Sequence, residues 1–328
     1  MYEVLWSRSL HMRSDAVAVA PGSVVVAERH SRLVRLDAAS GQPRWEVRVE
    51  DCWGTLEVAG DRCLYLSQAG VLHCVGLDSG RLLWATPGLR LRNHVAVSGS
   101  VVFTGGWRGY HPLTRVSLDD GVPLSWDSTM FAAAGPLARP RPVRSELGGD
   151  AVLIAGADEA VLWLVGSAGT ILAEWTLPEP VAFDDVGDAF DVADDGRVAF
   201  VCGRRTVAVL EPGGGVRVLW QHERDVVRHP PMLRGDTLWL VDGQGVAVVD
   251  LTRGVVGEFP GVVRAAASVP GEALFAGKDG RLVGVDPAGF ARQLATRPAL
   301  IGRLLAGSDG LVHAVGKGHL TTFSPTTP

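Results

Sequence analysis

Apolar residues occur in short runs rich in valine and leucine, and turn residues separate each run from the next. SVVVAE (23–28) is followed by RLVRLD (32–37), and DTLWLVD (236–242) by GVAVVDL (245–251). Short β-branched runs bounded by Gly, Asp and Ser are typical of strands joined as antiparallel hairpins. No stretch has the long helical periodicity of an α/β enzyme. The pattern therefore predicts an all-β protein.

One pattern recurs about every 40 residues: LDAASGQPRW (36–45), LDSGRLLW (77–84) and LDDGVPLSW (118–126). Weaker copies follow in VGSAGTILAEW (165–175), LEPGGGVRVLW (210–220), VDLTRGVVGEF (249–259) and VDPAGFARQL (285–294). Each unit reads as three strands, a glycine turn and a fourth strand that ends near an aromatic residue. The glycine supplies a positive φ in the turn, and the preceding Asp can accept bonds from the turn's own amides. We expect the tryptophan to pack between neighbouring units.

The last unit is incomplete at its C-terminal end. After Leu294 come three strand-like runs, RLLAGS (303–308), GLVHAVG (310–316) and HLTTFS (319–324). The missing fourth strand is YEVLWSRSL (2–10), which has Trp6 in the expected place. Pairing of the N-terminal strand with the C-terminal three would remove a free sheet edge. The sequence thus predicts an eight-bladed β-propeller of four-stranded antiparallel blades, a single domain over residues 1–328.

The blade pattern, quoted as LVRLDAASGQPRW, LHCVGLDSGRLLW and LTRVSLDDGVPLSW, resembles the PQQ-like propeller repeat. That family includes quinoprotein alcohol dehydrogenases and the propeller lipoprotein of outer-membrane assembly. The resemblance implies the fold, whereas propellers host many unrelated activities. The dehydrogenases would show adjacent cysteines over the quinone and a calcium ligand set, and the lipoprotein an export signal and a lipidated cysteine. The sequence has no Cys-Cys pair, and we expect a member without the quinone site, a bound metal or another cofactor.

Net charge and cysteine usage limit the classes of partner and the compartment that the sequence favours. The formal net charge is −5, which argues against nucleic-acid binding because phosphates need a basic face. No apolar segment has the length of a membrane helix, and the N-terminus does not read as a secretory signal. We therefore expect a cytoplasmic protein with neither membrane nor nucleic-acid partners. Cys63 and Cys74 flank a turn, so they are expected to face each other across a hairpin as thiols.

Charged residues recur at the predicted entrances of the inner strands. Aligning these strands on the turn that follows them places eight residues at one level: Asp15, Gly54, Arg92, Pro142, Asp188, Arg228, Arg264 and Ile301. Another four lie within two residues of it: His94, Arg144, His229 and Arg303. We take Asp15, Arg92, Arg228 and Arg264 as candidate binding residues at a channel mouth. The alternative is that Asp–Arg pairs simply neutralise one another.

Loops add further candidates. The segment GGWRGYHP (105–112) would present Trp107, Arg108, Tyr110 and His111 as an interface patch, unless Trp107 folds back on its blade. Two inter-blade connections, 127–146 and 178–196, are long, and long loops in compact domains are often binding loops. The acidic cluster Asp184, Asp185, Asp188 and Asp191 lacks the closing Glu of an EF-hand-like calcium loop.

No catalytic motif stands out: GxSxG, HExxH and a phosphate-binding glycine loop are all absent. The first hypothesis is a non-catalytic scaffold, a subunit of a bacterial multi-protein system that binds another protein through its loop-rich face. The alternative is an enzyme acting on a small molecule at the channel mouth, a lyase, cyclase or hydrolase. For it, Asp188, His229 and His94 are acid–base candidates recommended only by position. Sensing of a small ligand is a third reading.

Overall fold

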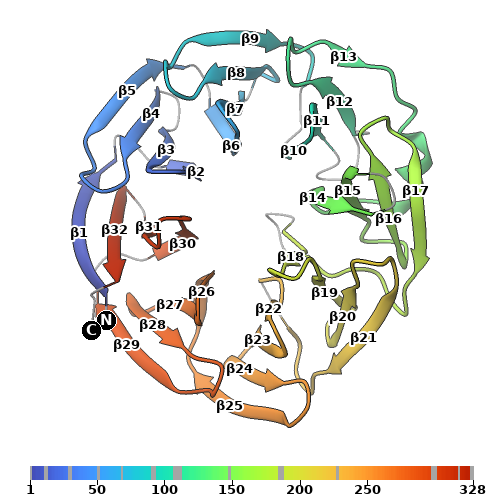
Figure 1. The fold of residues 1–328 in the computed structure, drawn as a ribbon, viewed down its shortest axis with the longest axis vertical. Coiled ribbons are helices and arrows are strands. Elements are labelled where there is room, and N and C mark those ends of the chain that lie inside the picture. Colours follow the sequence, from blue (N-terminus) through green and yellow to red (C-terminus); the bar gives the residue numbers. More distant parts are fainter. Residues whose placement is uncertain are drawn as a thin grey trace. The chain divides into compact units, whose positions relative to one another are not determined.

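The chain is an eight-bladed β-propeller whose blades are four-stranded antiparallel sheets, as the repeat predicts (Figure 1). The computed structural model describes residues 2–10, 14–28, 32–49, 52–67, 69–89, 94–105, 113–146, 149–183, 188–226, 229–296, 301–316 and 318–325. Within these ranges there is no helix of the length and apolar character that a bilayer crossing requires. Blades 1 to 8 are numbered here in the order of their first strands.

Two compact units of four blades each make up the chain, residues 1–90 with 261–328, and residues 91–260. The first unit holds blades 1, 2, 7 and 8. Its strands are β2 (Ser14–Ala20), β3 (Ser23–Glu28), β4 (Arg32–Asp37) and β5 (Pro43–Arg48) in blade 1; β6 (Cys52–Ala59), β7 (Arg62–Ser67), β8 (Leu72–Gly76) and β9 (Leu82–Thr86) in blade 2; β26 (Val263–Val269), β27 (Glu272–Gly277), β28 (Arg281–Val285) and β29 (Ala291–Thr296) in blade 7; and β30 (Ile301–Ala306), β31 (Val312–Gly316), β32 (His319–Pro325) and β1 (Tyr2–Ser9) in blade 8.

The second unit holds blades 3 to 6. Its strands are β10 (Val95–Ser98), β11 (Val101–Thr104), β12 (Thr114–Ser117) and β13 (Pro123–Leu124) in blade 3; β14 (Arg141–Ser145), β15 (Gly149–Ala155), β16 (Val161–Gly166) and β17 (Ile171–Thr176) in blade 4; β18 (Asp191–Val192), β19 (Val198–Cys202), β20 (Thr206–Leu210) and β21 (Val216–Gln221) in blade 5; and β22 (Met232–Arg234), β23 (Thr237–Val241), β24 (Gly245–Asp250) and β25 (Gly254–Pro260) in blade 6. The connection 127–146 contains a 3-10 helix, η2 (Thr129–Ala134), together with β14, and the connection 178–196 contains β18.

The N-terminal strand closes blade 8, which confirms the prediction from the incomplete last repeat. In Figure 1, β1 lies beside β32, blue against red. Their antiparallel register runs from Tyr2 opposite Pro325 to Ser9 opposite His319. Past the strand, the Leu10 amide donates to the Gly318 carbonyl at 2.8 Å. The first strand in the sequence is therefore the outermost strand of the last blade.

The recurring tryptophan and glycine meet across the interface between neighbouring blades. The indole Nε1 of Trp6 in blade 8 donates to the Ala38 carbonyl of blade 1 at 2.9 Å, in the turn that contains Gly41. A Cβ built on Gly41 would lie 2.6 Å from the Trp6 ring, closer than real Cβ atoms approach. The same contact joins Trp45 of blade 1 to the Leu77 carbonyl of blade 2 at 2.6 Å. The glycine is therefore required by the neighbouring indole as well as by its own φ of +69°.

The turn itself is fixed by the acidic residue that precedes the glycine. Asp37 Oδ1 accepts hydrogen bonds from the amides of Ala39 and Ser40 at 3.1 and 2.8 Å. Its Oδ2 accepts from Arg44 at 2.6 Å. These bonds hold the pKa of the Asp37 carboxyl well below its usual range, chiefly through Arg44 and then through Ser40. The expectation that the repeat's Asp would bind its own turn is confirmed here.

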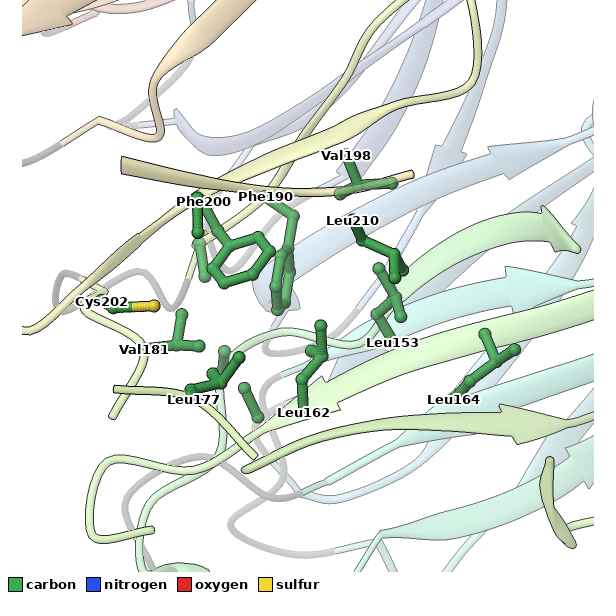
Figure 2. Packing of buried hydrophobic residues seen from close by; sticks show 14 of the residues in the cluster. Leu153, Leu162, Leu164, Leu177, Val181, Phe190, Val198, Phe200, Cys202 and Leu210 are labelled. Carbon is green, nitrogen blue, oxygen red and sulfur yellow. The ribbon is translucent and has the colours of Figure 1, made fainter. Parts of the chain in front are cut away.

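Apolar side chains from adjacent blades form the cores. Figure 2 shows one such cluster between blades 4 and 5, in which Leu153, Leu162 and Leu164 lie beside Phe200 and Leu210. Residues on both faces of the second and third strands are buried, as in Ser23–Glu28 and Thr206–Leu210. Within each unit, neighbouring blades therefore pack on each other through these apolar faces, and the two middle strands of a blade read as almost continuous apolar runs.

The outermost strands are irregular. In the described residues, the pairing of the third and fourth strands shifts by one residue in seven of the eight blades. The extra residues are Leu5, Arg44, Leu83, Leu172, Leu219, Val256 and Leu294. Bulges twist an edge strand away from a flat template, which discourages pairing with another chain. The repeat pattern does not predict these bulges.

The expected pairing of Cys63 with Cys74 is wrong by one residue. In the hairpin of β7 and β8, Cys63 lies opposite Val75 and Cys74 opposite Leu64. Because neighbouring residues of a strand point to opposite faces, the two sulfurs point away from each other. Both are buried thiols, as is Cys202, and burial raises the pKa of Cys74 to about 11.

Removing the closing strand should destabilise the fold severely. We expect a chain lacking residues 1–10 to aggregate, because it loses the β1–β32 ladder and the Trp6 contact together. Trp6→Ala should lower the free energy of unfolding by about 3 kcal/mol, and Trp6→Phe, which loses chiefly the indole bond, by about 1 kcal/mol. Urea unfolding measures these differences. A truncated chain that unfolds within a few degrees of the full chain would refute closure by β1.

A matched pair of variants separates the effect of the Trp6 contact at Gly41 from the effect of the positive φ. Gly41→Ala and Gly60→Ala both place a side chain at positive φ, and nothing lies within 4 Å of a Cβ at Gly60. We expect about 1 kcal/mol of destabilisation at Gly60, and about 1–3 kcal/mol more at Gly41 because the Trp6 ring must move. In a Trp6→Ala background the additional loss at Gly41 should vanish. Equal losses for both variants in the wild-type background would contradict the contact.

Candidate functional site

Several predicted site residues lie outside the described residues: Arg92, Trp107, Arg108, Tyr110, His111 and Arg228. The predictions made for them stay predictions. Asp15 and Gly54 lie in β2 and β6, and Arg264 in β26. Ile301 and Arg303 lie in β30, also in the first unit, and the remaining described candidates belong to the second unit.

In the first unit, the predicted level coincides with irregular backbone in all four first strands. The pairing shifts at Asp15 in β2, at Arg264 in β26 and at Gly302 in β30, and between Cys52 and Leu56 in β6. Bulges re-aim side chains at the rims of β-structures. Arg264 is exposed. Asp15, Gly54 and Arg264 therefore fall at irregular positions of their strands, whereas Ile301 lies one residue before the shift in β30.

Two of the three acid–base candidates come together in the second unit. Arg139 lies between them: its Nη1 is 3.8 Å from Oδ1 of Asp188, and its Nη2 donates to the Val95 carbonyl, next to His94, at 3.1 Å. His94 is 1% exposed. Burial, and then the Arg139 charge, lower the pKa of His94 to about 4, against a smaller opposing effect of Asp188. Arg139 was missed because it precedes β14 and does not fall at the aligned level.

A second pair joins the next two inner strands. Nη1 of Arg234 in β22 donates to Oδ2 of Asp191 in β18 at 2.7 Å, and the Leu233 amide donates to the same oxygen at 3.1 Å. In the sequence, Asp191 belongs to the acidic cluster that lacks the closing Glu of a calcium loop. Here its carboxylate is bound to an arginine of the neighbouring blade. His229 is half-buried, in the connection between β21 and β22.

A buried polar network connects blades 5 and 6. Asp242 Oδ2 is 3.1 Å from Nε2 of His222 and accepts from Nε of Arg224 at 2.5 Å. Its Oδ1 accepts from the amides of Gln244 and Gly245 at 2.7 and 2.9 Å. Burial opposes ionisation of Asp242, but the bond from His222 and the other donors outweigh it and lower the pKa. Because Asp242 holds the turn between β23 and β24, this His–Asp pair has a structural role.

An open groove of about 680 Å³ lies beside blade 4. It is lined by Met130 of η2, residues 158–160 of the β15–β16 turn, Val161 and Trp163 of β16, and Ile171, Glu174 and Thr176 of β17. The sequence analysis named the connection 127–146 as a candidate binding loop but did not identify this groove. Among the described residues, no group of three or more His, Cys, Asp or Glu could hold a metal ion.

The comparisons with known proteins agree with the repeat pattern. A family model described as outer membrane protein assembly factor BamB matches residues 3–121 and 52–257. The solved structure of BamB from Moraxella catarrhalis is 13% identical, with a TM-score of 0.76 over 99% of this chain and 100% of that chain. A search of curated proteins returns no significant match.

Other solved structures share the fold. The Dos1 propeller is 12% identical, with a TM-score of 0.77 over 98% of this chain and 95% of that chain. A quinohemoprotein alcohol dehydrogenase from Pseudomonas putida is 11% identical, with a TM-score of 0.70 over 100% of this chain and 78% of that chain. At these identities the likeness shows the fold alone.

The buried histidines should make the protein sensitive to acid. His94 and His313 have pKa values of about 4 in the folded protein, chiefly through burial, below the unfolded value of about 6.5. The unfolded state therefore binds protons first, so stability is complete above about pH 6.5 and is lost as the pH falls toward 4. Each histidine should contribute about 3 kcal/mol to that loss.

Urea unfolding at neutral pH and near pH 4.5 checks this expectation. His94→Gln should reduce the difference in stability between the two pH values by about 2 kcal/mol. His319→Gln, at an exposed position, serves as the control and should leave the difference unchanged. An acid dependence that is identical in wild type and His94→Gln would contradict the assignment.

Proposed function

The chain belongs to the PQQ-like propeller family of the outer membrane protein assembly factor BamB, and from this premise we propose that it is a non-catalytic scaffold that binds another protein. The proposed binding face carries the connections that enter the first strands, the loop-rich face. We further propose that the chain is a subunit of a bacterial multi-protein system. An assembly factor acts through other proteins, and the family description supports a protein partner by analogy.

The observation that carries the proposal is the pairing of charges on, or just before, the inner strands of neighbouring blades. Asp188 lies against Arg139, and Asp191 binds Arg234. A catalytic carboxylate must reach a substrate, whereas these carboxylates are directed to arginines of adjacent blades. Paired charges leave a rigid face whose loops are free to recognise a partner.

The enzyme hypothesis finds its best support in the His94–Arg139–Asp188 cluster. Asp188 keeps 46% of its side chain exposed. However, His94 is 1% exposed, so its ring does not meet a ligand in this conformation. A general acid or base must come within hydrogen-bond reach of the reacting group. The cluster therefore supports the scaffold better than the enzyme.

For the compartment we propose the cytoplasm. Cys74 and Cys202 are free, buried thiols. Free thiols are typical of proteins kept in reducing compartments, which supports the proposal.

Co-purification from the native cell tests the scaffold. We expect a tagged chain, expressed at its natural level, to co-elute with a partner protein in constant ratio during size exclusion, with a tag-only strain as the control. Cross-links to the partner should map to the connections before β14, β18 and β22. They should be rare at the turns 37–41 and 76–80, which lie at the opposite ends of their blades. A chain that elutes alone at every salt concentration would contradict the proposal.

A further inference from the structure

Charge is distributed very unevenly along the chain. Residues 145–196 contain twelve Asp and Glu and no Lys or Arg. The rest of the chain carries 24 acidic and 31 basic residues, so the overall charge of −5 conceals a strongly acidic segment in a basic remainder. The last three strands of blade 4, β15 to β17, and the groove residues other than Met130 belong to this segment, whereas Arg141 and Arg144 of β14 precede it.

The walls of the groove are fixed by backbone contacts between η2 and the β15–β16 turn. The Asp158 amide donates to the Ala134 carbonyl at 3.1 Å, and the Ala157 amide to the Pro136 carbonyl at 2.9 Å. Two glycines allow this approach: a Cβ on Gly156 would lie 2.2 Å from the Ala134 oxygen, and one on Gly135 would lie 1.9 Å from the Asp158 carboxylate. The groove is thus preformed by ordered backbone.

The lining of the groove is largely apolar and partly exposed. Met130 and Ile171 are 48% and 39% exposed. The Trp163 ring, which is 5% exposed, is held by Phe131, with ring centroids 5.2 Å apart, and by a 3.1 Å hydrogen bond from its Nε1 to Glu174. A volume of about 680 Å³ falls within the range that holds a compact ligand of several large groups. It can therefore take one or two large side chains.

Three carboxylates surround this apolar lining: Asp158, Glu159 and Glu174. Among the described residues, no Lys, Arg or His forms an ion pair with any of them. Two acidic residues on the outer strands of other blades have arginine partners: Glu46 lies 2.6 Å from Arg32, and Glu258 pairs with Arg224. Residues 145–196, which supply three of the four strands of blade 4, contain no Lys or Arg that could pair with the groove carboxylates. An apolar groove flanked by unneutralised carboxylates is complementary to a basic, apolar ligand.

We propose that this groove binds a short segment of a partner protein in which a large apolar side chain is flanked by Lys or Arg. The apolar side chain occupies the space between Met130, Trp163 and Ile171, and the cations meet Asp158, Glu159 and Glu174. The proposal rests on the proposed scaffold function and specifies the chemistry of its partner. A nucleic acid does not fit, because the carboxylates would repel its phosphates.

A random-peptide phage library panned against the intact chain tests the proposal. We expect the recovered peptides to combine Lys or Arg with Leu, Phe, Met or Trp. A labelled peptide from this pool should bind about tenfold more weakly to the triple variant Asp158→Asn, Glu159→Gln, Glu174→Gln. The glutamine at 174 keeps the acceptor for Trp163. Affinity should also fall as salt rises.

Two further variants make the test specific. The triple variant Glu3→Gln, Asp236→Asn, Asp309→Asn removes the same net charge at exposed positions outside the groove lining, and it should bind like wild type. Met130→Ser should weaken binding without changing its salt dependence. Peptides without basic residues, no recovered peptides, or equal loss in both triple variants would overturn the proposal.

The natural partner separates this inference from the scaffold function itself. If a partner co-purifies with wild type and is lost from the groove variant alone, both proposals are supported. If it is retained by the groove variant, the scaffold stands and the groove assignment is overturned. If wild type captures no partner, the scaffold proposal fails independently of the peptide result. Dimers of the chain that dissociate on groove substitution would also overturn the assignment, because a second copy would then be the occupant.

Discussion

The contact between a fourth-strand tryptophan and the turn of the next blade makes each blade depend on its neighbour. Trp6, Trp45, Trp126 and Trp175 each donate their indole hydrogen to a carbonyl of the following blade. The indole can come this close to the turn because a glycine stands where a Cβ would collide with the tryptophan ring, as at Gly41 and Gly80. A four-stranded blade alone would expose two apolar faces. The contact thereby fixes how far apart two blades lie, and the cores between them fill the space that remains.

This constraint explains why the fold was readable from the sequence while the candidate site was not. Glycine and tryptophan recur together because the contact between them joins neighbouring blades at four interfaces, so Trp6 could be assigned to the last blade by spacing alone. The pairing of Arg139 with Asp188 follows no repeat, since each blade places a different residue at its entrance. Likewise, a shift of one residue separated Cys63 from Cys74, because hairpin register depends on turn geometry that alternating apolar residues do not specify.

The structural comparisons fit the same division between a constrained framework and free loops. Proteins about 11–13% identical, an assembly factor and an alcohol dehydrogenase among them, keep this arrangement. The interfaces between blades require only three sequence features: a pair of apolar middle strands, a turn with a glycine and a large side chain. Function must then come from the parts that depart from the repeat. In the second unit, the largest departure with ordered structure is the connection that carries η2.

The connection that carries η2 fills part of the core between blades 3 and 4 and also lines the groove. Trp126 contacts the turn at Gly169 with its indole, which fills one end of the interface between blades 3 and 4. At the other side, Phe131 of η2 enters between Trp126 and Trp163, with ring centroids 5.9 and 5.2 Å away. Because Phe131 points inward, its neighbour Met130 is left exposed over β16 and β17. The insertion thus completes the core and creates the apolar lining of the groove in one step, and the absence of basic residues from 145 to 196 gives that lining its charge.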